Sequence, residues 1–111
     1  MAKFCVKRNI ESLEAQYENG TLFSSKLKKS SFQTILEILL NIRLGLEDCL
    51  KCFSKKTLKK VKGQKTIVRK ILDKSVSLKK RRKVFLDAGK TFRKVIEKHV
   101  LKEFIDNATE L

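Results

Sequence analysis

The sequence predicts an all-α protein, a small bundle of four to five helices with a highly basic middle section. Its 111 residues include no proline and only four glycines, so few residues interrupt a helix. Apolar residues in the first half of the chain recur at alternating steps of three and four, the spacing of one helix face. A hydrophobic content of 41% suffices for a modest core, so we expect residues 1–111 to form one domain.

Residues 1–30 are expected to hold a short extended arm, a short helix and a linker. The helix should begin at Asn9 and stop at Asn19-Gly20, because Asn favours helix starts and Gly favours helix ends. The residues that follow, up to Ser31, are rich in Ser and Lys and read as a linker.

An apolar core helix is expected over residues 31–53. Ser30 precedes Gln33 by three residues, a capping-box pattern that marks its start. Gly45 costs roughly 1 kcal/mol relative to Ala inside a helix, so it either permits close approach of another backbone or ends the helix early. The apolar face could also form a dimer seam, although a core helix of a bundle is the preferred interpretation. The residues on this face are Phe32, Ile35, Leu39, Ile42, Leu46, Cys49 and Phe53.

Residues 54–87 are expected to form the basic helical segment. Ser54 is placed to cap a first helix, which should break at Gly63, and a second helix follows. Ser77 should cap a third helix, which Ala88-Gly89 ends.

A C-terminal amphipathic helix is expected over residues 91–107, with Thr91 as its N-cap. Its charges are balanced, and its apolar residues lie on one wide face. The helix either folds back on the 31–53 helix or offers this face to a partner.

The positive charge is concentrated in one stretch of the chain. Of the net charge of +15, residues 54–83 carry +13, from fourteen Lys and Arg and one acid, Asp73. Residues 1–53 hold eight basic and six acidic residues, and residues 84–111 hold five of each. Because repulsion within such a block opposes folding, the block indicates a polyanionic partner.

The favoured partner is nucleic acid, DNA over RNA, bound through the phosphate backbone with little dependence on sequence. No aromatic residue lies between Lys55 and Lys83, which disfavours both base stacking on single strands and insertion into a membrane. We therefore expect no membrane partner. The candidate binding residues are Lys55, Lys56, Lys59, Lys60, Lys62, Lys65, Arg69, Lys70, Lys74, Lys79, Lys80, Arg81, Arg82 and Lys83.

The alternative function is a helical adaptor, a protein-interaction module that uses its apolar helix faces. A protein partner or a second copy would then bind the 91–107 helix or another apolar face, made of Phe32, Ile35, Leu39, Ile42 and Leu46. The run from Lys79 to Val84 also resembles a short nuclear-localisation signal.

Enzyme chemistry is not expected. The chain has one His, no paired carboxylates in an apolar setting and no complete phosphate loop. Cys49 and Cys52 have the spacing of a zinc half-site, but the other ligands would have to be Cys5 and His99, so we interpret Cys49 as a buried apolar residue. We expect no metal or cofactor, and an intracellular location, in the nucleus.

Residues 32–92 also resemble a known group of proteins. The segments concerned are the apolar 35–42, the lysine-rich 58–60 and the long basic run 68–85, in that order. This order is similar to that of a small basic protein encoded by Polinton (Maverick) transposons and related adintovirus-like elements. Such elements encode virus-like capsid proteins, so the resemblance implies a DNA-associated or virion-core role. It also implies a virion as the alternative location, and a capsid-associated protein-interaction module as a form of the alternative function.

Overall fold

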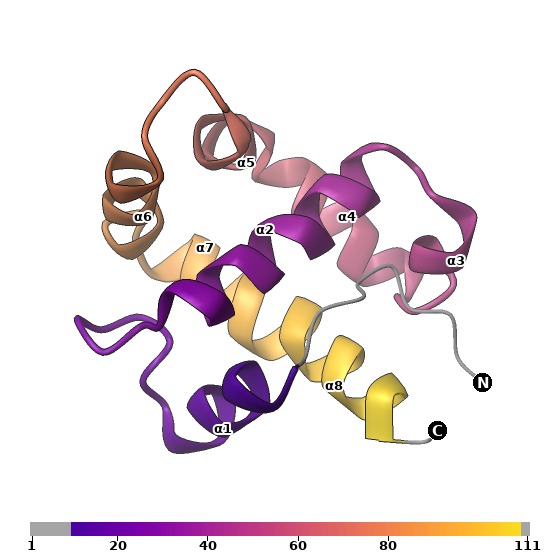
Figure 1. The fold of residues 1–111 in the computed structure, drawn as a ribbon. Coiled ribbons are helices and arrows are strands. Elements are labelled where there is room, and N and C mark those ends of the chain that lie inside the picture. Colours follow the sequence, from indigo (N-terminus) through magenta and orange to yellow (C-terminus); the bar gives the residue numbers. More distant parts are fainter. Residues whose placement is uncertain (1–9, 110–111) are drawn as a thin grey trace.

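In the computed structural model, which describes residues 10–109, every regular element is a helix (Figure 1). The all-α bundle is therefore confirmed for this part of the chain. The expected arm, the start at Asn9 and Cys5 lie outside the described residues. The elements are α1 (Glu11–Asn19), α2 (Lys29–Arg43), α3 (Glu47–Leu50), α4 (Lys55–Gly63), α5 (Lys65–Leu72), α6 (Leu78–Leu86), α7 (Lys90–Val95), η1 (Ile96–Val100) and α8 (Leu101–Thr109).

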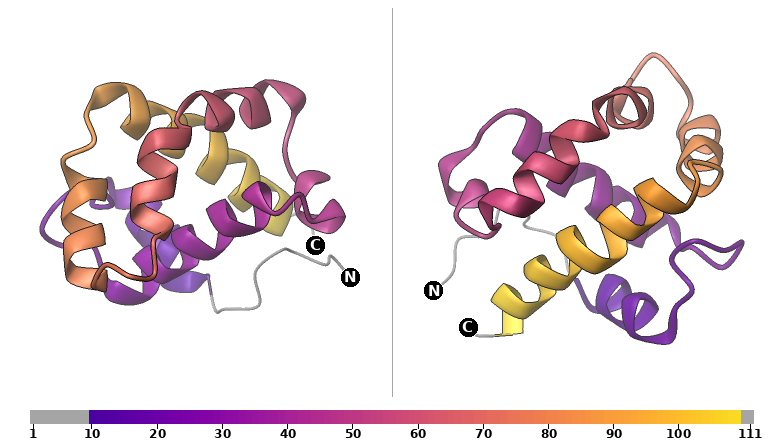
Figure 2. Two further views of the ribbon diagram at one scale, coloured as in Figure 1. Left: turned by 90° about the horizontal axis from the view of Figure 1, so that it is seen from above. Right: turned by 180° about the vertical axis from the view of Figure 1, so that it is seen from behind.

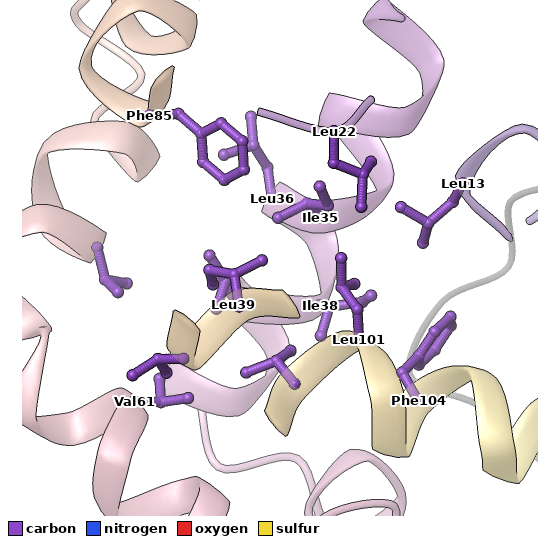
Figure 3. Packing of buried hydrophobic residues seen from close by; sticks show 14 of the residues in the cluster. Leu13, Leu22, Ile35, Leu36, Ile38, Leu39, Val61, Phe85, Leu101 and Phe104 are labelled. Carbon is purple, nitrogen blue, oxygen red and sulfur yellow. The ribbon is translucent and has the colours of Figure 1, made fainter. Parts of the chain in front are cut away.

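The C-terminal helix crosses α2 and forms the core with it. α7, the π-helical turn η1 and α8 follow one another without a break, so they act as one long helix (Figures 1 and 2). Ile38 of α2 and Leu101 of α8 lie together at the crossing (Figure 3). Burying one side chain of the size of Leu or Ile contributes about 1.5–3 kcal/mol, so burial of these residues favours the packing of the C-terminal helix against α2. The apolar face expected over residues 91–107 is thus folded back into the protein: Phe92, Val95, Ile96, Val100, Phe104 and Ile105 are all buried.

The helix predicted over residues 31–53 is two helices in the structure. α2 ends at Arg43, and Gly45 takes a left-handed conformation with φ of 71°. The Gly45 amide donates to the Ile42 carbonyl (3.0 Å) and the Leu46 amide donates to the Asn41 carbonyl (3.2 Å). This is the Schellman pattern that closes helix C-termini, so Gly45 ends the helix early, one of the two alternatives that its position left open.

The expected apolar face is divided by this break. Phe32, Ile35 and Leu39 are fully buried in the protein's own core. Ile42 is half-buried, and the Leu46 side chain is 46% exposed. Cys49 and Phe53, which follow in α3 and just after it, are buried again, so this face reaches the surface chiefly at Leu46.

Two expected N-caps are wrong. α2 begins at Lys29, before Ser30, because the buried Gln16 of α1 holds the chain that enters it. The Gln16 Oε1 accepts a hydrogen bond from the Lys28 amide (3.0 Å), and its Nε2 donates to the Lys26 carbonyl (2.7 Å). At the other site Gly89, with φ of 95°, occupies the N-cap position of α7 and leaves Thr91 inside the helix.

Three other expected helix boundaries are confirmed, at Gly20, Ser54 and Ser77. Gly20 ends α1 in a left-handed conformation with φ of 73°. The Ser54 Oγ accepts from the Thr57 amide (3.2 Å) at the start of α4, and the Ser77 Oγ accepts from the Lys80 amide (3.3 Å) at the start of α6. Within residues 10–109, no helix is both long enough and apolar enough to cross a bilayer.

Candidate nucleic-acid interface

The basic segment folds as three short helices, each with one side buried. Val61 anchors α4, Ile71 anchors α5 and Phe85 anchors α6. Because the apolar residues are few and spaced at helical intervals, most of the remaining positions face solvent, and these are largely Lys and Arg. α5 and α6 lie side by side, joined by a turn in which the Ser75 amide donates to the Asp73 Oδ1 (2.9 Å) (Figures 1 and 2).

Most of the predicted binding residues are exposed. Lys60, Arg81 and Arg82 are half-buried. The exposed members are Lys55, Lys56, Lys59, Lys62, Lys65, Arg69, Lys70, Lys74, Lys79, Lys80 and Lys83.

Arg81 and Arg82 contact backbone carbonyls of the protein itself. The Arg81 Nε donates to the Val76 carbonyl (3.1 Å) and its Nη1 to the Ile71 carbonyl at the end of α5 (3.4 Å). The Arg82 Nη2 donates to the carbonyls of Ser25 (3.1 Å) and Leu27 (2.8 Å), in the loop before α2. Part of each guanidinium is therefore engaged in holding the fold.

Three predicted lysines come together between α5 and α6. Lys70 of α5 and Lys80 and Lys83 of α6 line a surface depression of about 530 Å³. Its other lining residues are Ile67, Val84, Ala88 and the single acid Asp87. Three ammonium groups around one depression repel one another, and they are positioned to contact a shared anion.

A second group of cations lies on the opposite side of α5. Lys62 of α4 and Lys65 and Arg69 of α5 line another depression, together with Arg43 of α2. α5 contributes cations to both depressions, so the two groups flank this helix. They are together called the basic surface over α4 to α6 below. Arg43 was not among the binding residues predicted from the sequence, because it lies outside the basic segment. It joins the other cations only through the packing of α2 on α5.

Other predicted residues face elsewhere. Lys79 and Arg82 line a smaller depression of about 420 Å³ with Lys29, at the start of α2. Lys56 and Lys60 lie on the side of α4 that faces His99 of η1. Burial lowers the pKa of His99, and the positive charges of Lys60 and Lys56 lower it further. The fourteen residues therefore do not form one surface.

The N-terminus of α4 already holds an anion. The Glu103 Oε1 accepts from the Ser54 amide (2.7 Å), and its Oε2 accepts from the hydroxyls of Ser54 (3.0 Å) and Thr57 (2.7 Å). Burial raises the pKa of Glu103, but the hydrogen bonds from Ser54 and Thr57 outweigh it and hold this pKa below its ordinary value. The Ser54 and Thr57 amides at this helix end thus already have acceptors within the protein, the Glu103 Oε1 and the Ser54 Oγ.

No metal centre is visible in the described part of the chain, where no three His, Cys, Asp or Glu residues come close enough to hold an ion. Cys49 is fully buried, as expected, and Cys52 is half-buried. Comparison with known proteins gave no match among protein-family models, curated proteins or solved structures.

Proposed function

We propose that the protein binds duplex nucleic acid, DNA in preference to RNA, through the phosphate backbone and with little dependence on sequence. The observation that carries the proposal is the meeting of Lys70, Lys80 and Lys83 from two helices at one depression. Cations from separate elements that face a common space favour a partner with several negative charges. The three cations of Lys62, Lys65 and Arg69, on the other side of α5, extend the same surface.

The size of the protein suits a short contact with a duplex. Its dimensions are 35 × 26 × 24 Å, and one turn of B-DNA is about 34–36 Å long. Six cations on the surface over α4 to α6 can each neutralise one phosphate and release its condensed counterions. The logarithm of the binding constant should therefore fall against the logarithm of salt concentration with a slope of about −5.

Sequence readout is not part of the proposal. Bases are read in the major groove chiefly by Arg, Asn or Gln side chains on a helix that fits the groove. Both arginines of α6 donate to carbonyls of the fold, and the remaining cations of this surface are mostly lysines. Lysine acts largely as a point charge toward phosphate, so similar affinity for unrelated duplexes is expected.

The setting follows from the resemblance of residues 32–92 to the small basic protein of Polinton-type elements. On this proposal the duplex is the DNA of such an element, packaged in a virion core, and the protein enters the nucleus or a virion. The role is that of a binding protein without catalysis. Preference for DNA rests on the same resemblance.

The test is an anisotropy titration with a labelled duplex of about 25 base pairs at several salt concentrations. Lys80→Glu with Lys83→Glu should weaken binding more than about tenfold at low salt and reduce the slope by about 2. The matched control is Lys98→Glu with Lys102→Glu, which changes the net charge equally on the exposed side of η1 and α8 and should have a small effect.

Two results would overturn the proposal. One is a folded Lys80→Glu, Lys83→Glu protein with unchanged affinity, and the other is an equal loss in the control. An RNA duplex of the same sequence, titrated in parallel, tests the preference: tighter binding of RNA would reverse it.

A further inference from the structure

A groove of about 530 Å³ lies between α2, α3, α4 and α5, and its lining is largely apolar. It is separate from the depression between α5 and α6, with which it shares no lining residue. Six apolar side chains line it, namely Leu39, Ile42, Leu50, Leu58, Val61 and Val68. Leu39, Val61 and Val68 belong to the core, whereas Ile42, Leu50 and Leu58 are only half-buried.

Two exposed apolar side chains follow the groove residue Arg43 in the sequence. The segment that joins Arg43 to α3 holds Leu44, which is 62% exposed, and Leu46, which is 46% exposed. These are the two large apolar side chains that the described residues leave most exposed. Contiguous exposed apolar surface is uncommon on monomeric proteins and is typical of interaction sites.

The remaining lining residues are all cations. Arg43 comes from α2, Lys62 from α4, and Lys65 and Arg69 from α5. Among residues 10–109, no acidic side chain lines the groove. Four charges supplied by three helices are therefore spread around an apolar floor. A ligand that fits this arrangement has an apolar side and several separate negative charges.

We propose that this groove binds a short amphipathic helix of an acidic protein partner. The apolar side chains of such a helix, at positions i, i+3 or i+4, and i+7, would cover Ile42, Leu50 and Leu58. Its Asp and Glu residues, placed beside that apolar face, would pair with the four cations. A single anionic headgroup would meet only one or two of these cations, and a second copy of this chain would bring its own +15 charge to them.

This proposal does not depend on nucleic-acid binding, but the two sites share α5. An acidic helix in the groove would cover Lys62, Lys65 and Arg69, which belong to the basic surface over α4 to α6. The two ligands should therefore compete in part, while the apolar floor serves the peptide alone.

The test uses a labelled synthetic peptide of about 14 residues, with leucines on one helix face and glutamates beside them. A peptide of the same composition, with the leucines distributed around the helix, is the control. The amphipathic peptide should bind at least tenfold more tightly than the control. Ile42→Gln with Leu50→Gln should weaken peptide binding at least tenfold and leave duplex binding unchanged. Lys80→Glu with Lys83→Glu should do the reverse, so the two proposals fail separately.

A second measurement does not rely on any variant being folded. In ¹⁵N-labelled wild-type protein, the peptide should shift the amide resonances of the groove, from Leu39 to Arg43, at Leu50 and from Leu58 to Arg69. Equal binding of both peptides, or shifts confined to another face, would overturn the proposal. So would tighter binding of laurate with the same shifts, which would make this a site for anionic amphiphiles. Dimerisation of the protein alone, with the groove covered, would assign the groove to a second copy.

Discussion

Replacing Glu103 with alanine removes the carboxylate that joins α8 to the start of α4. The side chain accepts three hydrogen bonds, from the Ser54 amide, the Ser54 hydroxyl and the Thr57 hydroxyl, at distances of 2.7 to 3.0 Å. The residues are 46 and 49 positions apart in the chain, so the bonds are present only in the folded protein. Their loss should therefore appear in the free energy of unfolding.

The magnitude follows from the kind of hydrogen bond and the degree of burial. A hydrogen bond to a charged group contributes about 1.5–3 kcal/mol. Glu103 is half-buried, so water can satisfy some of the donors that the carboxylate leaves. We therefore expect Glu103→Ala to lower the free energy of unfolding by about 2–3 kcal/mol in total. For a chain of this length, this corresponds to a fall in Tm of about 10 °C. Glu103→Gln keeps an oxygen acceptor and loses the charge, so it should cost about 1–2 kcal/mol.

The assay is urea unfolding followed by circular dichroism at several pH values. Because the pKa of Glu103 is lowered in the folded protein, the unfolded chain binds its proton more readily. The stabilisation is therefore present above the ordinary pKa of 4.5 and is lost as the pH falls through the lower folded value. The difference between wild type and Glu103→Gln should shrink below about pH 4.

The control is Glu97→Gln, on the same long helix. Glu97 accepts from the Arg93 Nε at 2.9 Å, four residues away at the surface, so this change should cost under about 0.5 kcal/mol. An equal loss in the two Gln variants, or a difference for Glu103 that does not depend on pH, would refute the reasoning.

Three further predictions concern other parts of the fold. Burial and nearby lysines lower the pKa of His99, so its NMR titration midpoint should fall below 6.5, and the wild type should lose stability relative to His99→Gln as the pH drops from 7 through that midpoint. Gly45→Ala should destabilise by about 1 kcal/mol because φ is positive there, whereas Gly63→Ala should stabilise by about 0.5 kcal/mol, both measured by thermal unfolding. Arg82→Ala should cost about 1–2 kcal/mol in urea unfolding, through its bonds to two carbonyls, while Lys79→Ala at the exposed neighbouring turn should change little.

Helix boundaries were predicted well where the determinant is local. Gly20 ends α1, and Ser54 and Ser77 start α4 and α6, because a left-handed glycine or a side-chain cap acts within a few residues of itself. The sequence could not decide between the two alternatives at Gly45. The choice depends on which arrangement has the lower free energy, a longer α2 or a chain that turns so that α3 and α4 pack back against α2. That difference depends on contacts throughout the bundle.

The sequence predicted which segment carries the positive charge, but not which of its residues lie together on the surface. Gln16 and Glu103 fix the starts of α2 and α4 through contacts to distant residues, and no periodicity reports such contacts. Arg82 lies within a run of five cations, yet its carbonyl partners are 55 and 57 residues away. Arg43 joins the basic residues only after α2 packs against α5. Tertiary structure determines which long polar side chains pack against backbone that is distant in the sequence, so the sequence pattern alone did not reveal these contacts.

The helical state of the five consecutive cations, Lys79 to Lys83, limits which proteins could recognise them. These residues lie in α6, which is anchored by the fully buried Phe85, stacked on Phe23 with ring centroids 4.4 Å apart. A receptor that reads them as an extended peptide would first have to release α6, and removing Phe85 from the core alone costs about 1.5–3 kcal/mol. An extended form of this run would therefore be available only on a newly synthesised or unfolded chain, because the folded protein holds the same five residues in a helix.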